Sequence, residues 1–170
     1  MQSHHIERLD VEYGTLVPLH YMDPERELRV VSVAAWCPWH DLDDSRVVGE
    51  AVRPAIEASD ERVAILASGS LSHRIPDNRV GSDGMFTISA ELYRQVEHRV
   101  VELWQAGRFA ELVDMLPEHA KLCHGEGQMH DTAILLGALG WREHDRGVEI
   151  LTPRFASSGT GQENAVLPGP

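Results

Sequence analysis

The sequence is poor in cysteine, in lysine and in long apolar stretches, and each shortage excludes a class of protein. Its 170 residues include only two cysteines, Cys37 and Cys123, so it contains no disulfide framework and no CxxC pair. We expect both cysteines to be small core residues. No apolar run approaches the ~20 residues that span a bilayer, and residues 1–10 lack the apolar core of a signal peptide. These absences predict a cytoplasmic protein with no membrane partner.

Positive charge is also scarce. Lys121 is the only lysine, and 15 Lys+Arg stand against 27 Asp+Glu, for a formal net charge of -12. Binding to a phosphate backbone needs clustered basic residues, and single strands also need aromatic side chains between them. The sequence has neither pattern, so we expect no nucleic-acid partner. Histidine is abundant instead, with ten residues, and each position therefore has to be weighed as a site residue.

Apolar patterning predicts a domain of the α/β class, with a mixed sheet flanked by helices. Continuous β-branched runs predict buried strands at 28–36 and 62–67, and residues 148–151 predict a last short strand. Helical spacing of apolar residues predicts helices at 46–58, 89–105, 110–116 and 129–139. Asp43, Asp44 and Ser45 are N-cap candidates for the first helix, and Pro117 is expected to end the third. A glycine-rich loop is expected at 156–161.

Two segments place reactive side chains beside glycines. In the first, residues 68–74 follow a predicted strand and carry His73, whose residue type exchanges protons near neutral pH. A structural role, with His73 bonded to backbone, is an equal alternative. Ser68, Ser70 and Ser72 are weaker candidates as nucleophiles because the GxSxG motif is absent.

The second segment, residues 124–131, reads HGEGQMHD and places Glu126 between two glycines with histidines on either side. Carboxylate and imidazole groups at this spacing can bind a metal ion. The alternative is a polar loop that leads into the helix at 129–139, with His130 or Asp131 near its first turn.

Four motifs occur in order along the chain: VEYGTLVPL (11–19), LASGSLSHR (66–74), GEGQMHDT (125–132) and FASSGTGQ (155–162). Together they resemble the C-terminal part of the class III extradiol ring-cleavage dioxygenases of the catalytic B-subunit type. Within that family they are most similar to the branch that acts on 3,4-dihydroxyphenylacetate. Because the motifs cover nearly the whole chain, we expect residues 1–170 to be the C-terminal portion of such a catalytic domain.

The resemblance implies a non-haem Fe(II) site held by two histidines and one carboxylate, with Mn(II) as the alternative metal. The implied substrates are a catechol and O₂, and both oxygen atoms enter the ring-opened product. By motif position, Glu126 is implied as the carboxylate ligand and His73 as the catalytic acid–base. Tyr13 stands where many relatives carry histidine; it can donate a hydrogen bond but cannot replace histidine as a base near neutral pH.

The sequence lacks the two motifs that carry the family's metal-binding histidines, and His4 and His5 lie in no comparable context. We therefore expect an incomplete domain that is inactive alone, with a missing N-terminal half or a homo-oligomer as its partner. One alternative is a non-catalytic remnant or assembly subunit of the same fold. A metal-dependent hydrolase on a related α/β scaffold is a further alternative, and it lacks the same ligands.

Overall fold

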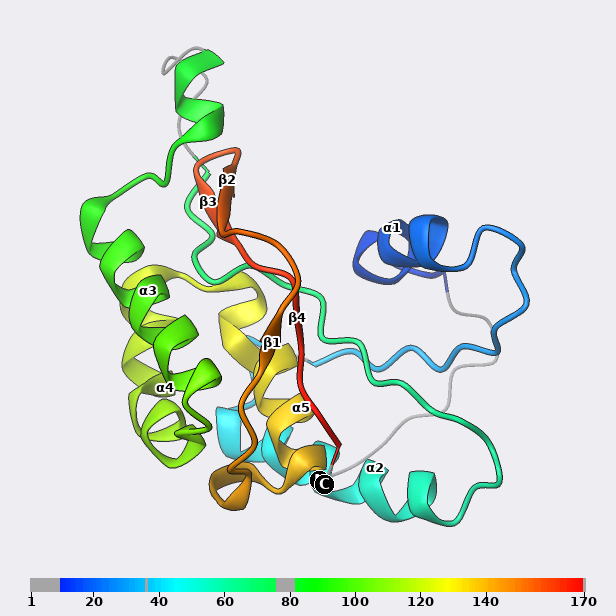
Figure 1. The fold of residues 1–170 in the computed structure, drawn as a ribbon. Coiled ribbons are helices and arrows are strands. Elements are labelled where there is room, and N and C mark those ends of the chain that lie inside the picture. The colour runs from blue at the N-terminus through cyan, green and yellow to red at the C-terminus, as the bar shows by residue number, and fades with distance from the viewer. Residues whose placement is uncertain (1–9, 36, 76–81, 170) are drawn as a thin grey trace.

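The computed structural model describes residues 10–35, 37–75 and 82–169 (Figure 1). Helices make up most of the ordered elements, and the described strands form two separate two-stranded antiparallel sheets, β1 with β4 and β2 with β3. Among these residues, no helix combines the length and apolar character needed to cross a bilayer. The α/β class is confirmed, although small antiparallel sheets replace the mixed sheet. The elements are α1 (Tyr13–Met22), α2 (Leu42–Glu57), the 3-10 helix η2 (Ser82–Phe86), α3 (Glu91–Gln105), α4 (Phe109–Cys123), η3 (Glu126–Met129), α5 (His130–Leu139), η4 (Trp141–Glu143), β1 (Glu149–Ile150), β2 (Phe155–Ser157), β3 (Thr160–Gln162) and β4 (Ala165–Val166).

The core lies between α3, α4 and α5, where the apolar faces of these helices meet. Leu71, from the segment between α2 and α3, is buried in the same core and so ties that segment to the helices. Burial of each large apolar side chain contributes about 1.5–3 kcal/mol to stability. The buried core residues are Leu71, Val100, Leu103, Phe109, Leu112, Val113, Leu136 and Val148, with a second cluster of Leu116, Met129 and Ala133.

Helices α2 and α5 approach each other closely because glycine stands at both contact points. A Cβ atom at Gly49 would lie 2.0 Å from the carbonyl oxygen of Ile134, and one at Gly137 would lie 2.3 Å from that of Arg46. A buried hydrogen bond of 2.7 Å between Ser45 Oγ and His130 Nδ1 joins the same two helices. The first turn of α5 is therefore held in place from α2.

Two predicted strands are wrong. Residues 28–35 and 62–67 do not form strands, and no backbone hydrogen bond joins them to a neighbouring strand within the described ranges; Trp36 lies outside those ranges. None of their apolar side chains is buried, and several are exposed, with Val31 88% and Leu66 51% accessible. A strand exists only when a neighbour completes its backbone hydrogen bonds, and no described segment does so here.

Three local predictions also need correction. Pro117 does not end α4, which continues to Cys123 with Pro117 in its interior, because buried residues on its later turns anchor it to the core. Residues 156–161 form most of the β2–β3 hairpin, in which Ser158 and Gly159 adopt the left-handed conformation of a tight turn. The N-cap of α2 is Asp41, which forms a capping box with Asp44.

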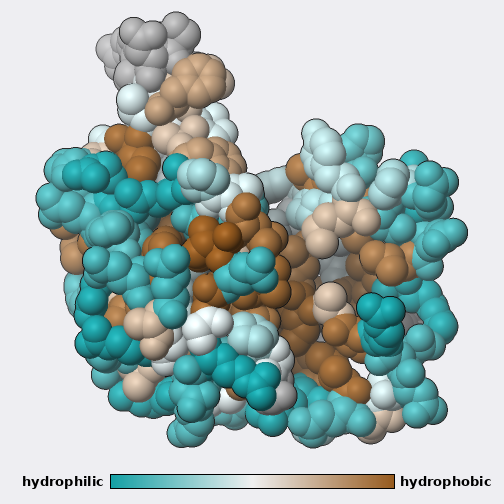
Figure 2. Space-filling view, in the orientation of Figure 1, coloured by the Kyte–Doolittle hydropathy of each residue, from teal (hydrophilic) through white to brown (hydrophobic). Residues whose placement is uncertain are grey.

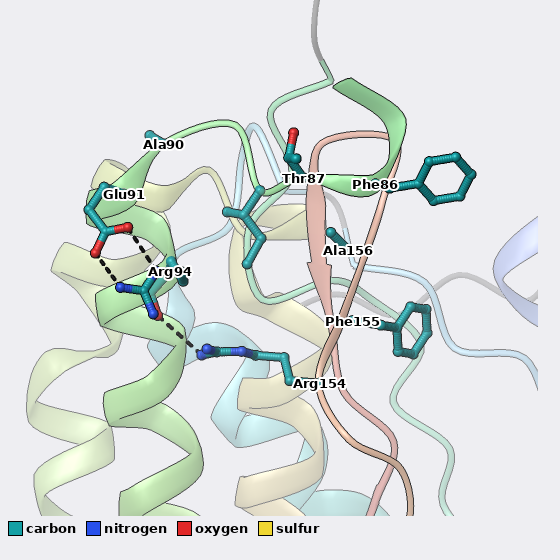
Figure 3. Close-up of a pocket in the computed structure, with 9 residues that line it drawn as sticks. Phe86, Thr87, Ala90, Glu91, Arg94, Arg154, Phe155 and Ala156 are labelled. Carbon is teal, nitrogen blue, oxygen red and sulfur yellow. Dashed lines mark hydrogen bonds and ion pairs between the residues drawn. The ribbon is translucent and has the colours of Figure 1, made fainter. Parts of the chain in front are cut away.

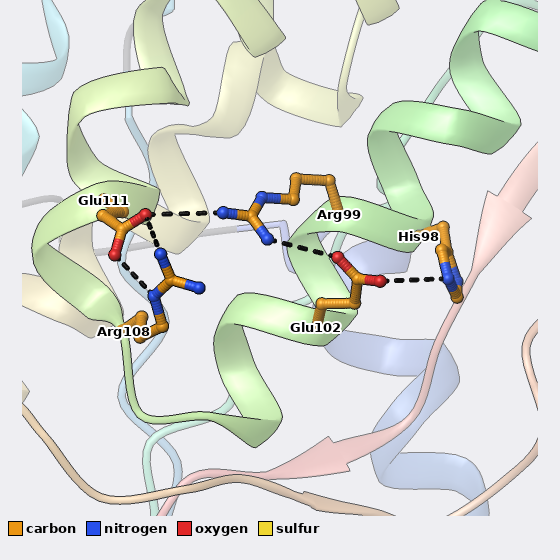
Figure 4. Close-up of polar contacts among 5 residues, drawn as sticks. All are labelled: His98, Arg99, Glu102, Arg108 and Glu111. Atoms are coloured by element: carbon orange, nitrogen blue, oxygen red, sulfur yellow. Dashed lines mark hydrogen bonds and ion pairs between the residues drawn. The ribbon is translucent and has the colours of Figure 1, made fainter.

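Charged side chains link the exposed faces of α3 and α4 (Figure 4). Arg99 contacts Glu102 at 3.2 Å and Glu111 at 3.4 Å, while Arg108 forms a two-pronged ion pair with Glu111 at 2.5 Å. His98 Nε2 lies 3.3 Å from Glu102. Exposed pairs of this kind contribute at most about 1 kcal/mol each and are screened by salt. The buried apolar faces, not these ion pairs, therefore dominate the packing of the two helices.

Candidate functional site

Glu126 is the centre of the candidate site. It is the first residue of η3, shortly after the end of α4, and its backbone N–H donates to the carbonyl oxygen of Ser70 at 3.0 Å. Its carboxylate accepts two further hydrogen bonds, from Ser70 Oγ to Oε2 at 2.9 Å and from Tyr13 Oη to Oε1 at 2.5 Å. Three segments that are far apart in the sequence therefore meet at one carboxylate.

His73 completes this group. Its Nε2 atom lies 3.9 Å from Glu126 Oε1, and its backbone N–H donates to the carbonyl oxygen of Cys123 at 3.3 Å. The His73 side chain is 34% exposed and that of Glu126 is 22% exposed, so both groups can be reached by a ligand while remaining held by the protein. A histidine in this position can give a proton to a bound molecule or take one from it.

A cavity of about 400 Å³ opens beside these groups. It includes the single lysine of the chain and the residues that flank Glu126 on both sides. Its mixture of cationic, acidic and backbone polar groups suits a small polar ligand better than an apolar one. The cavity is lined by Cys37, His73, Ala120, Lys121, His124, Gly125, Glu126, Gly127 and Gln128.

The backbone around Glu126 is strained. His124, Gln128 and Met129 have φ values of 51°, 53° and 65°, in the left-handed region that side chains other than glycine rarely occupy. Such positions cost about 1–3 kcal/mol each when the residue is not glycine, and they cluster at functional sites. A Cβ atom at Gly125 would lie 2.1 Å from Met129 Sδ, so any other residue there would displace the Met129 side chain. Surrounding contacts thus hold His124, Gln128 and Met129 in backbone conformations that these residue types do not favour.

The Glu126 carboxylate favours the protonated form of Tyr13, which can donate a hydrogen bond. The hydrogen bond to Glu126, followed by repulsion from the Glu126 charge, raises the pKa of the Tyr13 phenol above its ordinary value of 10.0. Asp131 lies behind the site, where burial raises the pKa of its carboxyl group. Its Oδ1 atom is buried without a hydrogen-bond partner among the described residues, and Gly69 leaves room for its Oδ2 atom.

A comparison with protein families gives the affiliation of the chain. The family described as "Catalytic LigB subunit of aromatic ring-opening dioxygenase" matches residues 1–168. The chain belongs to this family. It is 47% identical over 157 residues to the 3,4-dihydroxyphenylacetate 2,3-dioxygenase of Escherichia coli, a match that covers 92% of the chain and 57% of that relative. The predicted family resemblance is therefore confirmed.

A second, more distant relative is the beta subunit of a 2-aminophenol 1,6-dioxygenase from a Pseudomonas species. It is 28% identical over 174 residues, with 94% of the chain and 54% of that relative covered. The chain thus spans little more than half the length of the relatives it matches. Both relatives are named as dioxygenases, and one is named as a subunit of a larger enzyme.

The metal ion that the family resemblance implies does not fit the described residues by themselves. Within residues 10–35, 37–75 and 82–169, no group of three His, Cys, Asp or Glu side chains converges on one point. Glu126 offers one carboxylate, and the nearby His73 imidazole is the group expected to move protons rather than to bind metal. The 2-His-1-carboxylate site of non-haem Fe(II) oxygenases uses three protein ligands. The described part of this chain supplies one.

The structure brings together the three residues for which the sequence predicts a role, namely Tyr13, His73 and Glu126. Their individual roles stay predictions. Cys123 is buried, as expected, whereas Cys37 is half-buried and lines the cavity. His4 and His5 lie outside the described residues.

Sequence reasoning missed the residues that support this group. It weighed Ser70 only as a weak nucleophile, but its hydroxyl donates to Glu126 and accepts from Gln162 Nε2 at 2.7 Å. It also overlooked Glu97, which is buried on α3 beside Ser72. A detectable signal existed for Glu97, because a carboxylate stands on the apolar face of the predicted helix at 89–105, between Tyr93 and Val100 in the helical repeat.

Proposed function

We propose that this chain contributes the carboxylate and the acid–base group of an extradiol dioxygenase site. The reaction is cleavage of a catechol ring, such as that of 3,4-dihydroxyphenylacetate, by O₂. The observation that carries this proposal is the convergence of Tyr13, His73 and Glu126 in a chain of the aromatic ring-opening dioxygenase family. The 47% identity to a 3,4-dihydroxyphenylacetate 2,3-dioxygenase supports the choice of substrate class.

His73 is the residue we propose to move protons. A catechol hydroxyl must lose its proton before the ring becomes electron-rich enough to react, and an accessible imidazole can accept that proton near neutral pH. Tyr13 would have a different task. Its raised pKa keeps the phenol protonated, so Tyr13 orients the Glu126 carboxylate or a bound ligand by donating a hydrogen bond.

Glu126 is the residue we propose as the carboxylate ligand of Fe(II), or of Mn(II), which accepts the same ligand types. The metal, when bound, would supply the redox chemistry that activates O₂. Because the described residues by themselves do not fit the ion, we propose that the two further ligands come from the part of the relatives that this chain does not span. The isolated chain is accordingly expected to bind iron weakly and to lack turnover.

The partner we propose is a polypeptide equivalent to the part of the Escherichia coli relative that the match does not cover. Support comes from the two segments that were expected to be strands. Residues 28–35 and 62–67 carry exposed apolar side chains, among them Val31 and Leu66, and form no backbone–backbone hydrogen bond with the other described residues. Figure 2 shows apolar side chains gathered in the middle of this face, between α3 and α4 on one side and α1 on the other. Added strands would cover these side chains and complete the backbone hydrogen bonds.

Reconstitution tests the proposal. The chain is mixed with the polypeptide that corresponds to the uncovered part of the Escherichia coli relative, and iron content, oxygen uptake and loss of 3,4-dihydroxyphenylacetate are measured. We expect iron at one equivalent and turnover only in the mixture. Glu126→Gln should lower iron content, whereas His73→Phe should keep iron and lose turnover.

Three outcomes would count against the proposal. Iron at one equivalent with turnover by the isolated 170-residue chain would contradict the ligand count. A stable complex that binds no iron and consumes no oxygen would instead favour the alternative of a non-catalytic assembly subunit of the same fold. Self-association of the chain without any interaction with the added polypeptide would favour a second copy of this chain as the partner.

A further inference from the structure

Glu97 is a carboxyl group buried directly beneath the segment that carries Ser70 and His73. It lies on the inner face of α3, and its relative exposure is 0%. Placing a carboxylate away from water costs several kcal/mol unless the group is paired or becomes neutral. No described side chain forms an ion pair with it, which distinguishes Glu97 from the exposed acids of α3 such as Glu91 and Glu102.

The contacts of Glu97 connect three elements. Ser72, which is also fully buried, donates its hydroxyl to Glu97 Oε1 at 2.5 Å and accepts a hydrogen bond from the Gly161 backbone N–H at 3.1 Å. The carbonyl oxygen of Gly161 in turn accepts a hydrogen bond from the backbone N–H of Leu71 at 3.0 Å. Helix α3, residues 70–73 and strand β3 are therefore joined at one buried point.

Glycine at position 161 is a condition for this arrangement. A Cβ atom there would lie 2.0–2.2 Å from three atoms of the Glu97 carboxyl group. The FASSGTGQ motif therefore leaves space for a carboxyl group that comes from a different part of the chain. This close approach explains why the motif has glycine at position 161, which contact with the candidate site alone does not explain.

The segment that this contact holds in place carries residues of the candidate site on both sides of Ser72. Two residues before it, Ser70 donates to Glu126 Oε2 at 2.9 Å; immediately after it, His73 reaches within 3.9 Å of Glu126 Oε1. A shift of Ser72 would move both of these neighbours. We propose that Glu97 is a positioning residue that anchors Ser72 and thereby sets the distance between His73 and Glu126. The functional importance of this distance rests on the proposed acid–base role of His73.

The surroundings of Glu97 favour the neutral acid. Burial raises the pKa of Glu97, and the Ser72 hydrogen bond and the Arg154 charge oppose that rise only in part. Arg154 is directed to the backbone of α3, where its Nη1 donates to the carbonyl oxygen of Arg94 at 3.1 Å (Figure 3). The remaining titratable neighbour is the Cys123 thiol, whose pKa burial raises to about 11, so it carries no charge near neutral pH. Glu97 Oε2 has no hydrogen-bond partner within the described part of the chain.

Nuclear magnetic resonance of the His73 imidazole in the full chain tests this inference without substrate or metal. Glu97→Gln keeps the shape, the neutral state and an oxygen that can accept from Ser72, so we expect the His73 resonances to match those of the wild type. Glu97→Met and Ser72→Ala remove the contact from either side, and we expect each to shift or broaden the His73 resonances. Glu102→Gln is the matched control, an exposed acid on the same helix that should affect His98 and not His73.

A second measurement follows the carboxyl group itself. The carbon-13 resonance of the Glu97 carboxyl should titrate at a pH above the ordinary value for glutamate, which is about 4.3. His73 resonances that stay unchanged in both Glu97→Met and Ser72→Ala would overturn the inference and leave Glu97 a packing residue. If Glu97→Met does not fold, Ser72→Ala alone decides. Failure of iron binding in the reconstituted mixture would refute the proposed function while leaving this result intact.

Discussion

The Oη atom of Tyr13 lies 2.5 Å from Oε1 of Glu126, although 113 positions separate the two residues in the sequence. Tyr13 opens helix α1, and Glu126 follows helix α4. This contact joins the first motif of the chain to the third. With Ser70 bonded to Oε2, both oxygens of the Glu126 carboxylate accept a hydrogen bond from the protein.

The phenol of Tyr13 should report the charge of Glu126. Because Glu126 raises the pKa of Tyr13, the substitution Glu126→Gln should lower that pKa toward the ordinary value of 10.0. Titration of the tyrosine ring resonances by nuclear magnetic resonance measures the change. The ring of Tyr21, exposed on the same helix, serves as the internal control. An identical Tyr13 titration in both proteins would refute the contact.

Substitution of Gly49 on α2 or Gly137 on α5, the two glycines where these helices meet, should destabilise the protein. Gly49→Ala places a Cβ atom 2.0 Å from a backbone carbonyl oxygen that no side-chain movement can relieve. We expect a loss of about 1–3 kcal/mol in the free energy of unfolding, the usual cost of overpacking. Urea denaturation measures it. Gly169→Ala is the control, because nothing lies within 4 Å of the added atom, and it should leave stability unchanged.

Stability should fall as the pH drops below the ordinary titration range of histidine. Burial lowers the pKa of His119, whose Nε2 donates to the Leu71 carbonyl oxygen at 2.6 Å. The unfolded chain therefore binds a proton at about pH 6.5, before the folded chain does, and stability is present above that pH and lost below it. Urea denaturation between pH 8 and about pH 5 should show a flatter profile for His119→Gln than for the wild type.

The exposed His98 provides the comparison for that experiment. His98→Gln removes a histidine from the surface of α3, where its side chain is 66% exposed, and should leave the pH profile close to that of the wild type. Equal profiles for the wild type and His119→Gln would show that this buried imidazole does not contribute to the pH dependence.

Acidic substitutions in residues 28–35 and 62–67 should weaken partner binding without affecting folding. Val31→Asp and Leu66→Asp alter side chains that contact solvent in this structure, so each should change the free energy of unfolding by no more than about 0.5 kcal/mol. Each should weaken binding of the added polypeptide at least about tenfold, because a charge would then be buried without a partner. Isothermal titration calorimetry measures both variants. Leu92→Asp, half exposed on α3, is the control and should bind normally.

Much of the helical structure could be predicted from the sequence. Helical spacing of apolar residues located α3 and α5 to within two residues, because each helix buries one face and the repeat of that face is visible in the chain. The motifs also identified Tyr13, His73 and Glu126 as a set. Family membership, confirmed over residues 1–168, follows from sequence alone as well.

Tertiary structure decided the features that depend on distant neighbours. Residues 28–35 and 62–67 have the composition of buried strands, yet they have no paired neighbour among the described residues, and composition cannot create one. In the sequence, Glu97 is only an acidic residue on the apolar face of a predicted helix. Its contacts with Ser72 and Gly161 exist only in the folded molecule. Local sequence determines which helices form, since their hydrogen bonds stay within the segment, whereas strand pairing and buried polar contacts join groups far apart in the chain and become visible only in the folded molecule.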